Sequence, residues 1–323
     1  ALGAEGREFE SRRSDHCFKG LQHMLQTLFA FWRALLRACT CAAVLEGPAH
    51  LALSCVLPVC ILLYAVMPLS SADFPPQTPR YALVDALRGC AMVWMTLFHF
   101  CFDLAHFGLW GQNFRTDPVW TAQRTAIVSL FLFCAGLSQA IAVQQGQSWA
   151  RFGRRWLQIA GCALLVSAAS YAMFPQSFIY FGVLHGMAVM LCLVRWSAGW
   201  GRGLWWAGGV ALCMPSIAAY AFSHGAEQWA PWFNAPAFNW LGLVSRKPFT
   251  QDYVPVFPWL GVMWWGMASG QWLLSRKPGW LQRPLPGFLK GPAVLGRWSL
   301  SYYMVHQPVL MGGLMAFLWL SKH

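Results

Sequence analysis

Seven apolar stretches, each about 20 residues long, follow one another after residue 80 and leave few folds open to the chain. A helix needs about 20 apolar residues to cross the hydrocarbon core of a bilayer. Because backbone polar groups in hydrocarbon must be hydrogen-bonded within their own segment, each stretch is predicted to be a helix. The predicted spans are residues 83–104, 119–143, 156–174, 179–196, 203–222, 254–274 and 298–320. The predicted fold class is therefore an all-α, polytopic membrane bundle.

The composition agrees with this fold class and excludes several soluble classes of protein. Hydrophobic residues make up 57% of the 323 residues and charged residues 11%, against about 45–50% and about 25% in soluble globular proteins. A soluble domain of this length could not bury so much apolar surface. A cytosolic enzyme, a disordered chain and a nucleic-acid-binding module are excluded, and membrane lipid is the expected partner. The oligomeric state is left open.

The 11 cysteines predict neither a disulfide framework nor a metal site. Most of them lie inside apolar stretches, where a thiol packs as a small hydrophobic group. No C-x-x-C pair and no zinc-ligand spacing occurs among them. The sequence therefore predicts no bound metal.

Residues 1–79 differ from the rest and are predicted to form a separate N-terminal extension to a membrane domain at residues 80–323. The stretch 21–45 carries Arg33 and Arg37 near its centre, and two arginines at mid-membrane make it a poor span. The stretch 49–69 is apolar enough to insert, although Pro58 interrupts it. Three alternatives stay open: an interfacial amphipathic helix, an uncleaved targeting segment, or a weakly ordered, artefactual extension from a misplaced start codon, with Met67 as the natural start.

Lysine and arginine are divided unevenly between the predicted loops. The loops after the second, fourth and sixth spans carry ten cations and no acid, namely Arg151, Arg154, Arg155, Arg195, Arg202, Arg276, Lys277, Arg283, Lys290 and Arg297. The opposite face carries four cations, Arg115, Arg246, Lys247 and Lys322, together with Asp117, Glu227 and Asp252. Since Lys and Arg are enriched in cytoplasmic loops, the ten-cation face is predicted to be cytoplasmic. The first span then starts in the cytoplasm and the C-terminus lies outside.

Ionisable residues inside predicted spans are expensive and are candidate functional residues. The first span carries a polar stripe that consists of Asp85, Arg88, Met92, Thr96, His99, Asp103 and His106. At 100° per residue these positions fall within an arc of about 80°. Asp85 and Arg88 have the spacing of a structural ion pair. His99 and Asp103 have the spacing of a hydrogen bond, which fits either a buried structural network or a general base oriented by a carboxylate.

Four helices are predicted to place ionisable side chains at one depth near the outer surface. With a rise of 1.5 Å per residue, His99 lies about 24 Å above the start of its span and His185 about 9 Å below the outer surface. Arg124 and Asp252 fall at a similar depth, and His306 lies nearer the middle of the membrane. Each histidine taken singly also fits a satisfied core residue, but their convergence favours a functional site.

A second group of cations lies at the cytoplasmic ends of the spans. It consists of Arg88, Arg154, Arg155 and Arg297. Such residues fit topology determination and contact with anionic lipid. They also fit a mouth that binds phosphate groups.

Four segments resemble a known family of membrane enzymes. They are RYALVDALRGCAMVWMTLFHFCFDL (80–104), YFGVLHGMAV (180–189), DYVPVFPWLGVMWWG (252–266) and LGRWSLSYYMVHQPVL (295–310). Together, and in this order, they resemble the bacterial branch of the heparan-alpha-glucosaminide N-acetyltransferase catalytic-domain family. The resemblance covers about residues 80–320. It implies transfer of an acetyl group from cytosolic acetyl-CoA to a sugar amine or hydroxyl on the extracytoplasmic side of a bacterial inner membrane.

The resemblance also points to particular residues. Asp85–Gly89 matches the family's Asp-x-x-Arg-Gly motif. Lysosomal members carry their proposed catalytic histidine in the loop after this helix, where His106 lies nearest, whereas His99 matches the bacterial pattern. Which of the two histidines is catalytic stays open at this point, as does the identity of the acceptor.

Together, the residues and the resemblance give one hypothesis for the mechanism. Acetyl-CoA is expected to dock from the cytoplasm on some of the four inner arginines. His99, held by Asp103, is expected to act as general base or to accept the acetyl group transiently. His185 or Arg124 is expected to stabilise the oxyanion of the tetrahedral intermediate. The alternative is a proton-coupled transporter that uses the same intramembrane His/Asp stripe.

We predict that positions 154 and 277 face the cytoplasm and position 232 faces outward, because of the ten-to-four division of loop cations. Single cysteines at these positions, in a background that controls for the native cysteines, would be probed with a membrane-impermeant thiol reagent on intact cells. Only the cysteine at position 232 should react. Labelling of position 154 from outside would reverse the predicted orientation.

Overall fold

The computed structural model describes residues 81–114 and 116–321. The expectations for residues 1–79 and for Arg115 and Lys322 lie outside these residues. Within the described ranges the chain forms ten α-helices, α3 to α12, and no sheet. The predicted all-α fold class is confirmed.

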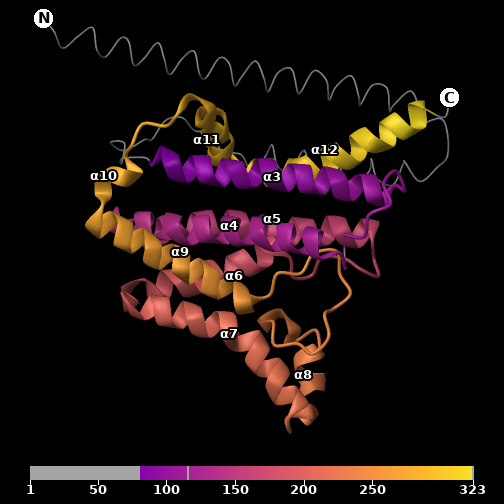
Figure 1. The fold of residues 1–323 in the computed structure, drawn as a ribbon, viewed down its shortest axis with the longest axis horizontal. Coiled ribbons are helices and arrows are strands. Elements are labelled where there is room, and N and C mark those ends of the chain that lie inside the picture. The colour runs from indigo at the N-terminus through magenta and orange to yellow at the C-terminus, as the bar shows by residue number, and fades with distance from the viewer. Residues whose placement is uncertain (1–80, 115, 322–323) are drawn as a thin grey trace, which may run out of the picture. The chain divides into compact units, whose positions relative to one another are not determined.

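All seven predicted spans are helices (Figure 1). They are α3 (Ala82–His106), α4 (Pro118–Gln144), α5 (Trp149–Met173), α6 (Val183–Trp196), α7 (Gly203–Ser223), α9 (Val256–Arg276) and α12 (Ser299–Leu320). Three short helices connect them, namely α8 (Ala230–Asn234), α10 (Pro278–Leu281) and α11 (Lys290–Arg297). The sequence analysis did not predict the short helices, because it treated the segments between spans as loops.

Two of the long helices begin four or more residues away from the predicted start. α5 begins seven residues earlier, at Trp149, because Ser148 caps it by accepting a hydrogen bond from the Arg151 backbone N–H at 3.3 Å. α6 begins four residues later, at Val183, because the chain before it is held extended. The backbone N–H of Gln251 donates to the Ser177 carbonyl at 3.0 Å, and a β-bridge joins residues 181 and 253.

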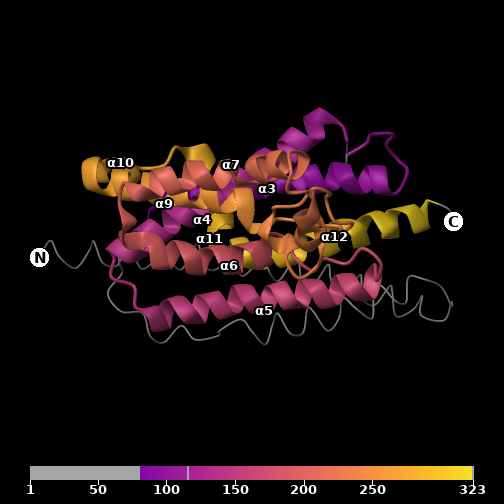
Figure 2. The same cartoon turned by 90° about the horizontal axis from the view of Figure 1, so that it is seen from below.

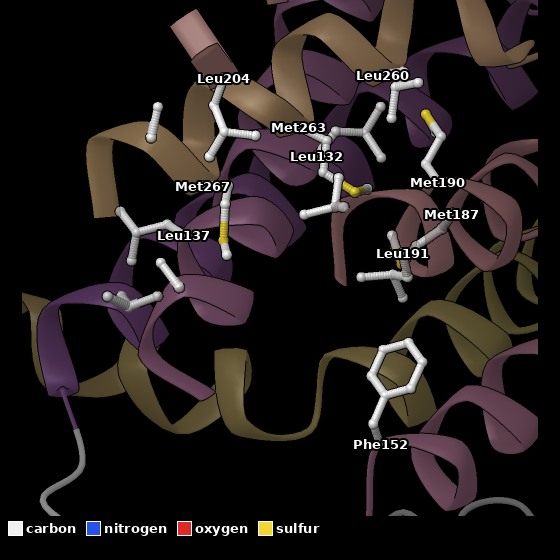
Figure 3. Close-up of a cluster of buried hydrophobic side chains, with 14 of the residues drawn as sticks. Leu132, Leu137, Phe152, Met187, Met190, Leu191, Leu204, Leu260, Met263 and Met267 are labelled. Atoms are coloured by element: carbon white, nitrogen blue, oxygen red, sulfur yellow. The ribbon is translucent and has the colours of Figure 1, made fainter. Parts of the chain in front are cut away.

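α9 is the most central of the long helices. It packs against α4, α7 and α6, and α4 in turn packs against α3 (Figures 1 and 2). Figure 3 shows the buried side chains at the centre of this packing. Leu132, Leu204, Met190, Met263 and Met267 are all fully buried there. Methionine fills irregular gaps well, because its side chain is unbranched and flexible.

Six of the seven long helices in the described residues are long and apolar enough to cross a membrane by composition alone, and α9 is the exception. The contacts of α12 with α3 indicate that α9 crosses as well. Thr96, His99 and Asp103 on α3 contact Tyr302, His306 and Gln307 on α12 in the same order. α3 and α12 therefore run parallel. Two parallel spans need an odd number of membrane crossings between them. The helices α4, α5, α6 and α7 supply four crossings, so α9 supplies the fifth.

α11 approaches α3 closely at two glycines. A Cβ atom on Gly89 would collide with the carbonyl oxygen of Pro292, and one on Gly296 would collide with the carbonyl oxygen of Asp85. Small residues let helices in a membrane approach to backbone contact. The contact fixes α11 against the first turns of α3 and so fixes the start of α12.

We predict that Gly89→Ala lowers the free energy of unfolding by about 1–3 kcal/mol, because the added methyl group forces α11 away from α3. Gly209→Ala on α7 is the matched control, since a Cβ there meets nothing within 4 Å, and alanine favours a helix over glycine by up to about 1 kcal/mol. The apparent melting temperature of the purified protein in detergent measures both. An equal loss in the two variants would mean that the α3–α11 contact contributes no stability.

Candidate functional site

Two polar clusters lie on α3, an inner one near its start and an outer one near its end. The Arg88 guanidinium donates hydrogen bonds to Asp85 Oδ1 at 3.2 Å, to the Gly296 carbonyl oxygen at 3.1 Å and to Ser138 Oγ at 2.6 Å. Asp85 Oδ2 lies 3.9 Å from Arg297 Nε. Arg88 thereby ties α3 to α4 and to α11. The ion pair predicted between Asp85 and Arg88 is present.

The four arginines proposed to bind phosphate are therefore not equivalent. Arg88 has its donors committed to three partners in the fold. Arg297 pairs with Asp85 but keeps 45% of its side chain exposed. Arg154 and Arg155 are exposed in the first two turns of α5. Arg154, Arg155 and Arg297 thus remain accessible to a ligand, whereas Arg88 is mainly a structural residue.

The outer cluster is formed where α3 meets α12, and we name it the α3–α12 seam. It consists of Thr96, His99 and Asp103 on α3 and Tyr302, His306 and Gln307 on α12. The hydroxyl groups of Thr96 and Tyr302 share a hydrogen bond of 2.7 Å. The rings of His99 and His306 lie 5.2 Å apart. Gln307 Nε2 donates to Asp103 Oδ1 at 2.8 Å.

The seam corrects one expectation from the sequence. His99 was expected to be held by Asp103, but the Asp103 carboxylate accepts its hydrogen bond from Gln307, a residue of another helix. His99 instead turns its ring toward His306 and toward the neighbouring Phe98. The i, i+4 spacing allowed the bond within α3, but the packing of α12 supplied each side chain with a different neighbour.

Three buried polar atoms of the seam have no hydrogen-bond partner among the described residues. They are Asp103 Oδ2, His306 Nε2 and Gln307 Oε1. Asp103 is 1% exposed and His306 7%. A buried polar atom without a partner costs free energy, about 1–3 kcal/mol in proteins. Three such atoms in one helix–helix contact therefore indicate unused binding capacity rather than a finished structural network.

His185 lies at the start of α6 and has a partner for each ring nitrogen. The Gly182 backbone N–H donates to Nδ1 at 3.3 Å, so Nδ1 is an acceptor. In the neutral ring Nε2 then carries the hydrogen and donates to Ser167 Oγ at 3.0 Å, while the Ser167 hydroxyl donates to the Ile179 carbonyl at 2.6 Å. This is the arrangement of a helix cap and a satisfied core histidine.

Asp252 also holds the start of α6. Its Oδ2 accepts a hydrogen bond from the Val183 backbone N–H at 2.8 Å, and a carboxylate is favourable at the positive end of a helix. Burial raises the pKa of the Asp252 carboxyl, while this hydrogen bond and the charges of Arg124 and Lys247 act to lower the pKa. Asp252 also acts electrostatically on Tyr303, whose backbone carbonyl lies in the seam. Arg124 on α4 and Asp252 in the extended segment before α9 thus interact electrostatically.

His106, the second candidate for the catalytic histidine, is exposed at the end of α3, where its ring stacks on Phe102. The sequence analysis missed Gln307 and Ser138, because it examined ionisable residues inside spans and these two side chains are neutral. A glutamine beside a histidine in an otherwise apolar helix was the available signal for Gln307. Among the described residues no group of three His, Cys, Asp or Glu side chains could hold a metal ion.

The comparison with protein families gives one match. The model described as "Heparan-alpha-glucosaminide N-acetyltransferase, catalytic" matches residues 80–308, more than two thirds of the chain. The matched range includes both polar clusters of α3 and the helices that cover them. Searches against curated proteins and against solved structures found no match.

We predict that Arg88→Ala lowers the free energy of unfolding by about 2–4 kcal/mol, because it removes the donor of three hydrogen bonds, one of them to the buried carboxylate of Asp85. Arg154→Ala should stay within about 0.5 kcal/mol of the unchanged protein, since its side chain is exposed. Thermal unfolding in detergent would compare the two. If both variants unfold at the same temperature as the unchanged protein, Arg88 is free to serve a ligand.

Proposed function

The chain belongs to the heparan-alpha-glucosaminide N-acetyltransferase catalytic family, a family of membrane acetyltransferases, and from this premise we propose an acetyl-CoA-dependent reaction across the membrane. The acetyl group passes from cytosolic acetyl-CoA to an amine or hydroxyl of a saccharide on the extracytoplasmic side. The membrane is a bacterial inner membrane, as the sequence resemblance suggests. The six apolar spans already make the chain a multi-pass membrane protein.

The observation that carries this proposal is the α3–α12 seam. It combines two histidine rings in contact with three buried polar atoms that have no partner among the described residues. Acyl transfer needs a base that removes a proton from the acceptor, and a site inside a membrane excludes bulk water from the reacting groups. The seam supplies both conditions within the range that matches the family.

The inner end of the bundle is the proposed docking place of acetyl-CoA. Arg154, Arg155 and Arg297 are exposed enough to contact its phosphate groups, and arginine binds phosphate in a bidentate manner. Arg88 supports the same end indirectly by fixing α11, and so Arg297, against α3. The thioester would then have to reach the seam further along α3.

The other residues predicted from the sequence have different roles in the proposed site. Arg124, half-buried on α4, is the proposed donor to the oxyanion of the tetrahedral intermediate. Asp252 and His185 position the start of α6 next to it. His99 lines the seam as the neighbour of His306, and His106 is exposed at the end of α3. A proton-coupled transporter would use the same histidines without acetyl-CoA, so the test below separates the two functions.

We predict that the purified chain releases free CoA thiol from acetyl-CoA when glucosamine is present. The combined variant Arg154→Ala, Arg155→Ala should raise KM for acetyl-CoA about tenfold, the effect of about 1.4 kcal/mol, with kcat unchanged. The difference should shrink in high salt, because exposed phosphate contacts are screened.

Arg202→Ala is the matched control, since Arg202 is also an exposed arginine of the predicted cytoplasmic face but lies at the start of α7. Its KM should equal that of the unchanged protein. Absence of acceptor-dependent thiol release from the unchanged protein would contradict the proposed function. An unchanged KM in the double variant would remove Arg154 and Arg155 from the docking place.

A further inference from the structure

The ring of His306 is fixed in one protonation pattern by the backbone of its own helix. His306 Nδ1 lies 2.7 Å from the carbonyl oxygen of Tyr303. A carbonyl oxygen can only accept a hydrogen bond, so Nδ1 must carry the hydrogen. In the neutral ring the lone pair is then on Nε2. Nε2 is buried and has no hydrogen-bond partner among residues 81–114 and 116–321.

The atoms beside His306 have the same hydrogen-bonding character. Gln307 Nε2 donates to Asp103 Oδ1, so the remaining amide atom, Oε1, is an acceptor. Asp103 Oδ2 belongs to a carboxylate, which is an acceptor when ionised. The three buried atoms without a partner are therefore all acceptors. A ligand that satisfies them has to offer N–H or O–H groups, as an amine or a sugar hydroxyl does, and cannot be an anion.

His99 lacks these properties. Within the described part of the chain its ring contacts Phe98 and His306 but makes no hydrogen bond. A base that acts in a transition state gains from a fixed orientation, which in His306 the Tyr303 carbonyl provides. The ring of His306 is further fixed by stacking on Tyr302, with centroids 5.9 Å apart.

We propose that His306, and not His99, is the base of the acetyl transfer, and that Asp103 and Gln307 hold the acceptor group against its Nε2. The proposal rests on the proposed function. It replaces the expectation from the sequence, which gave the base to His99 and left His306 as an accessory residue.

The reaction balances with these residues and the two substrates. The acceptor, written X–H with X its nitrogen or oxygen, forms a bond from X to the thioester carbonyl carbon. Its proton passes to His306 Nε2, whose Nδ1–H stays on the Tyr303 carbonyl. When the tetrahedral intermediate collapses, the C–S bond breaks and the electron pair leaves on the CoA sulfur. His306 then returns the proton to that sulfur, which gives acetylated acceptor, CoA thiol and a neutral histidine.

His306→Asn tests the proposal, because the asparagine amide nitrogen can keep the hydrogen bond to the Tyr303 carbonyl while no atom replaces Nε2. We expect kcat to fall about 100-fold or more, with the melting temperature and the KM for acetyl-CoA unchanged. A purely structural role would instead lower the melting temperature. His306→Gln, which lacks a base at the same position, is the second variant in case the first fails to fold, and it should lose kcat to the same extent.

His99→Asn should lose less than about tenfold in kcat, and His224→Asn should lose nothing, because His224 is exposed at the end of α7. A kcat within threefold of the unchanged protein in folded His306→Asn or His306→Gln would overturn the proposal, and so would a greater loss in His99→Asn than in His306→Asn. Failure of the proposed function itself looks different, since then the unchanged protein releases no CoA thiol with glucosamine.

Discussion

The polar stripe of α3 has to be covered by other parts of the chain, because charged and polar side chains cannot face hydrocarbon. Residues 290–307 supply most of the hydrogen-bond partners of the stripe, and Ser138 on α4 supplies a further one to Arg88. α11 brings the Gly296 carbonyl to Arg88 and Arg297 to Asp85. α12 brings Tyr302 to Thr96 and Gln307 to Asp103. The other helices connect α3 to this C-terminal segment, and α11 and α12 pack against α3.

The stripe itself could be predicted from the sequence, because it follows from helical periodicity alone. The seven long helices were predicted correctly for a similar reason, since their apolar stretches have the length of a bilayer span. The partners of the stripe could not be predicted. Asp103 and Gln307 are 204 positions apart, and nothing in the local pattern of either helix specifies that pairing. The local pattern therefore predicted His99 as the partner of Asp103, whereas in the structure the partner is Gln307.

Other differences arise where tertiary contacts act on the ends of helices. Residues 177–181 are apolar enough to extend α6, but hydrogen bonds from Thr250 and Gln251 hold them extended. His185 and Asp252 were predicted as site residues because they are ionisable and fall at a similar estimated depth near the outer surface. In the structure both are bonded to the first turn of α6 or to the residue before it. The placement of ionisable groups near one depth was thus a better guide to location than to role.

The two clusters of α3 also define what an acetyl-CoA-dependent reaction would require of the bundle. Asp85 and His99 are 14 residues apart, which corresponds to about 21 Å along a helix. Between them on the same stripe lies Met92, which is fully buried, with its backbone carbonyl bonded to Thr96. A thioester that followed α3 from the inner arginines to the seam would meet this side chain. Methionine is unbranched and has three rotatable bonds, so its side chain can change conformation beside a ligand more readily than a branched one.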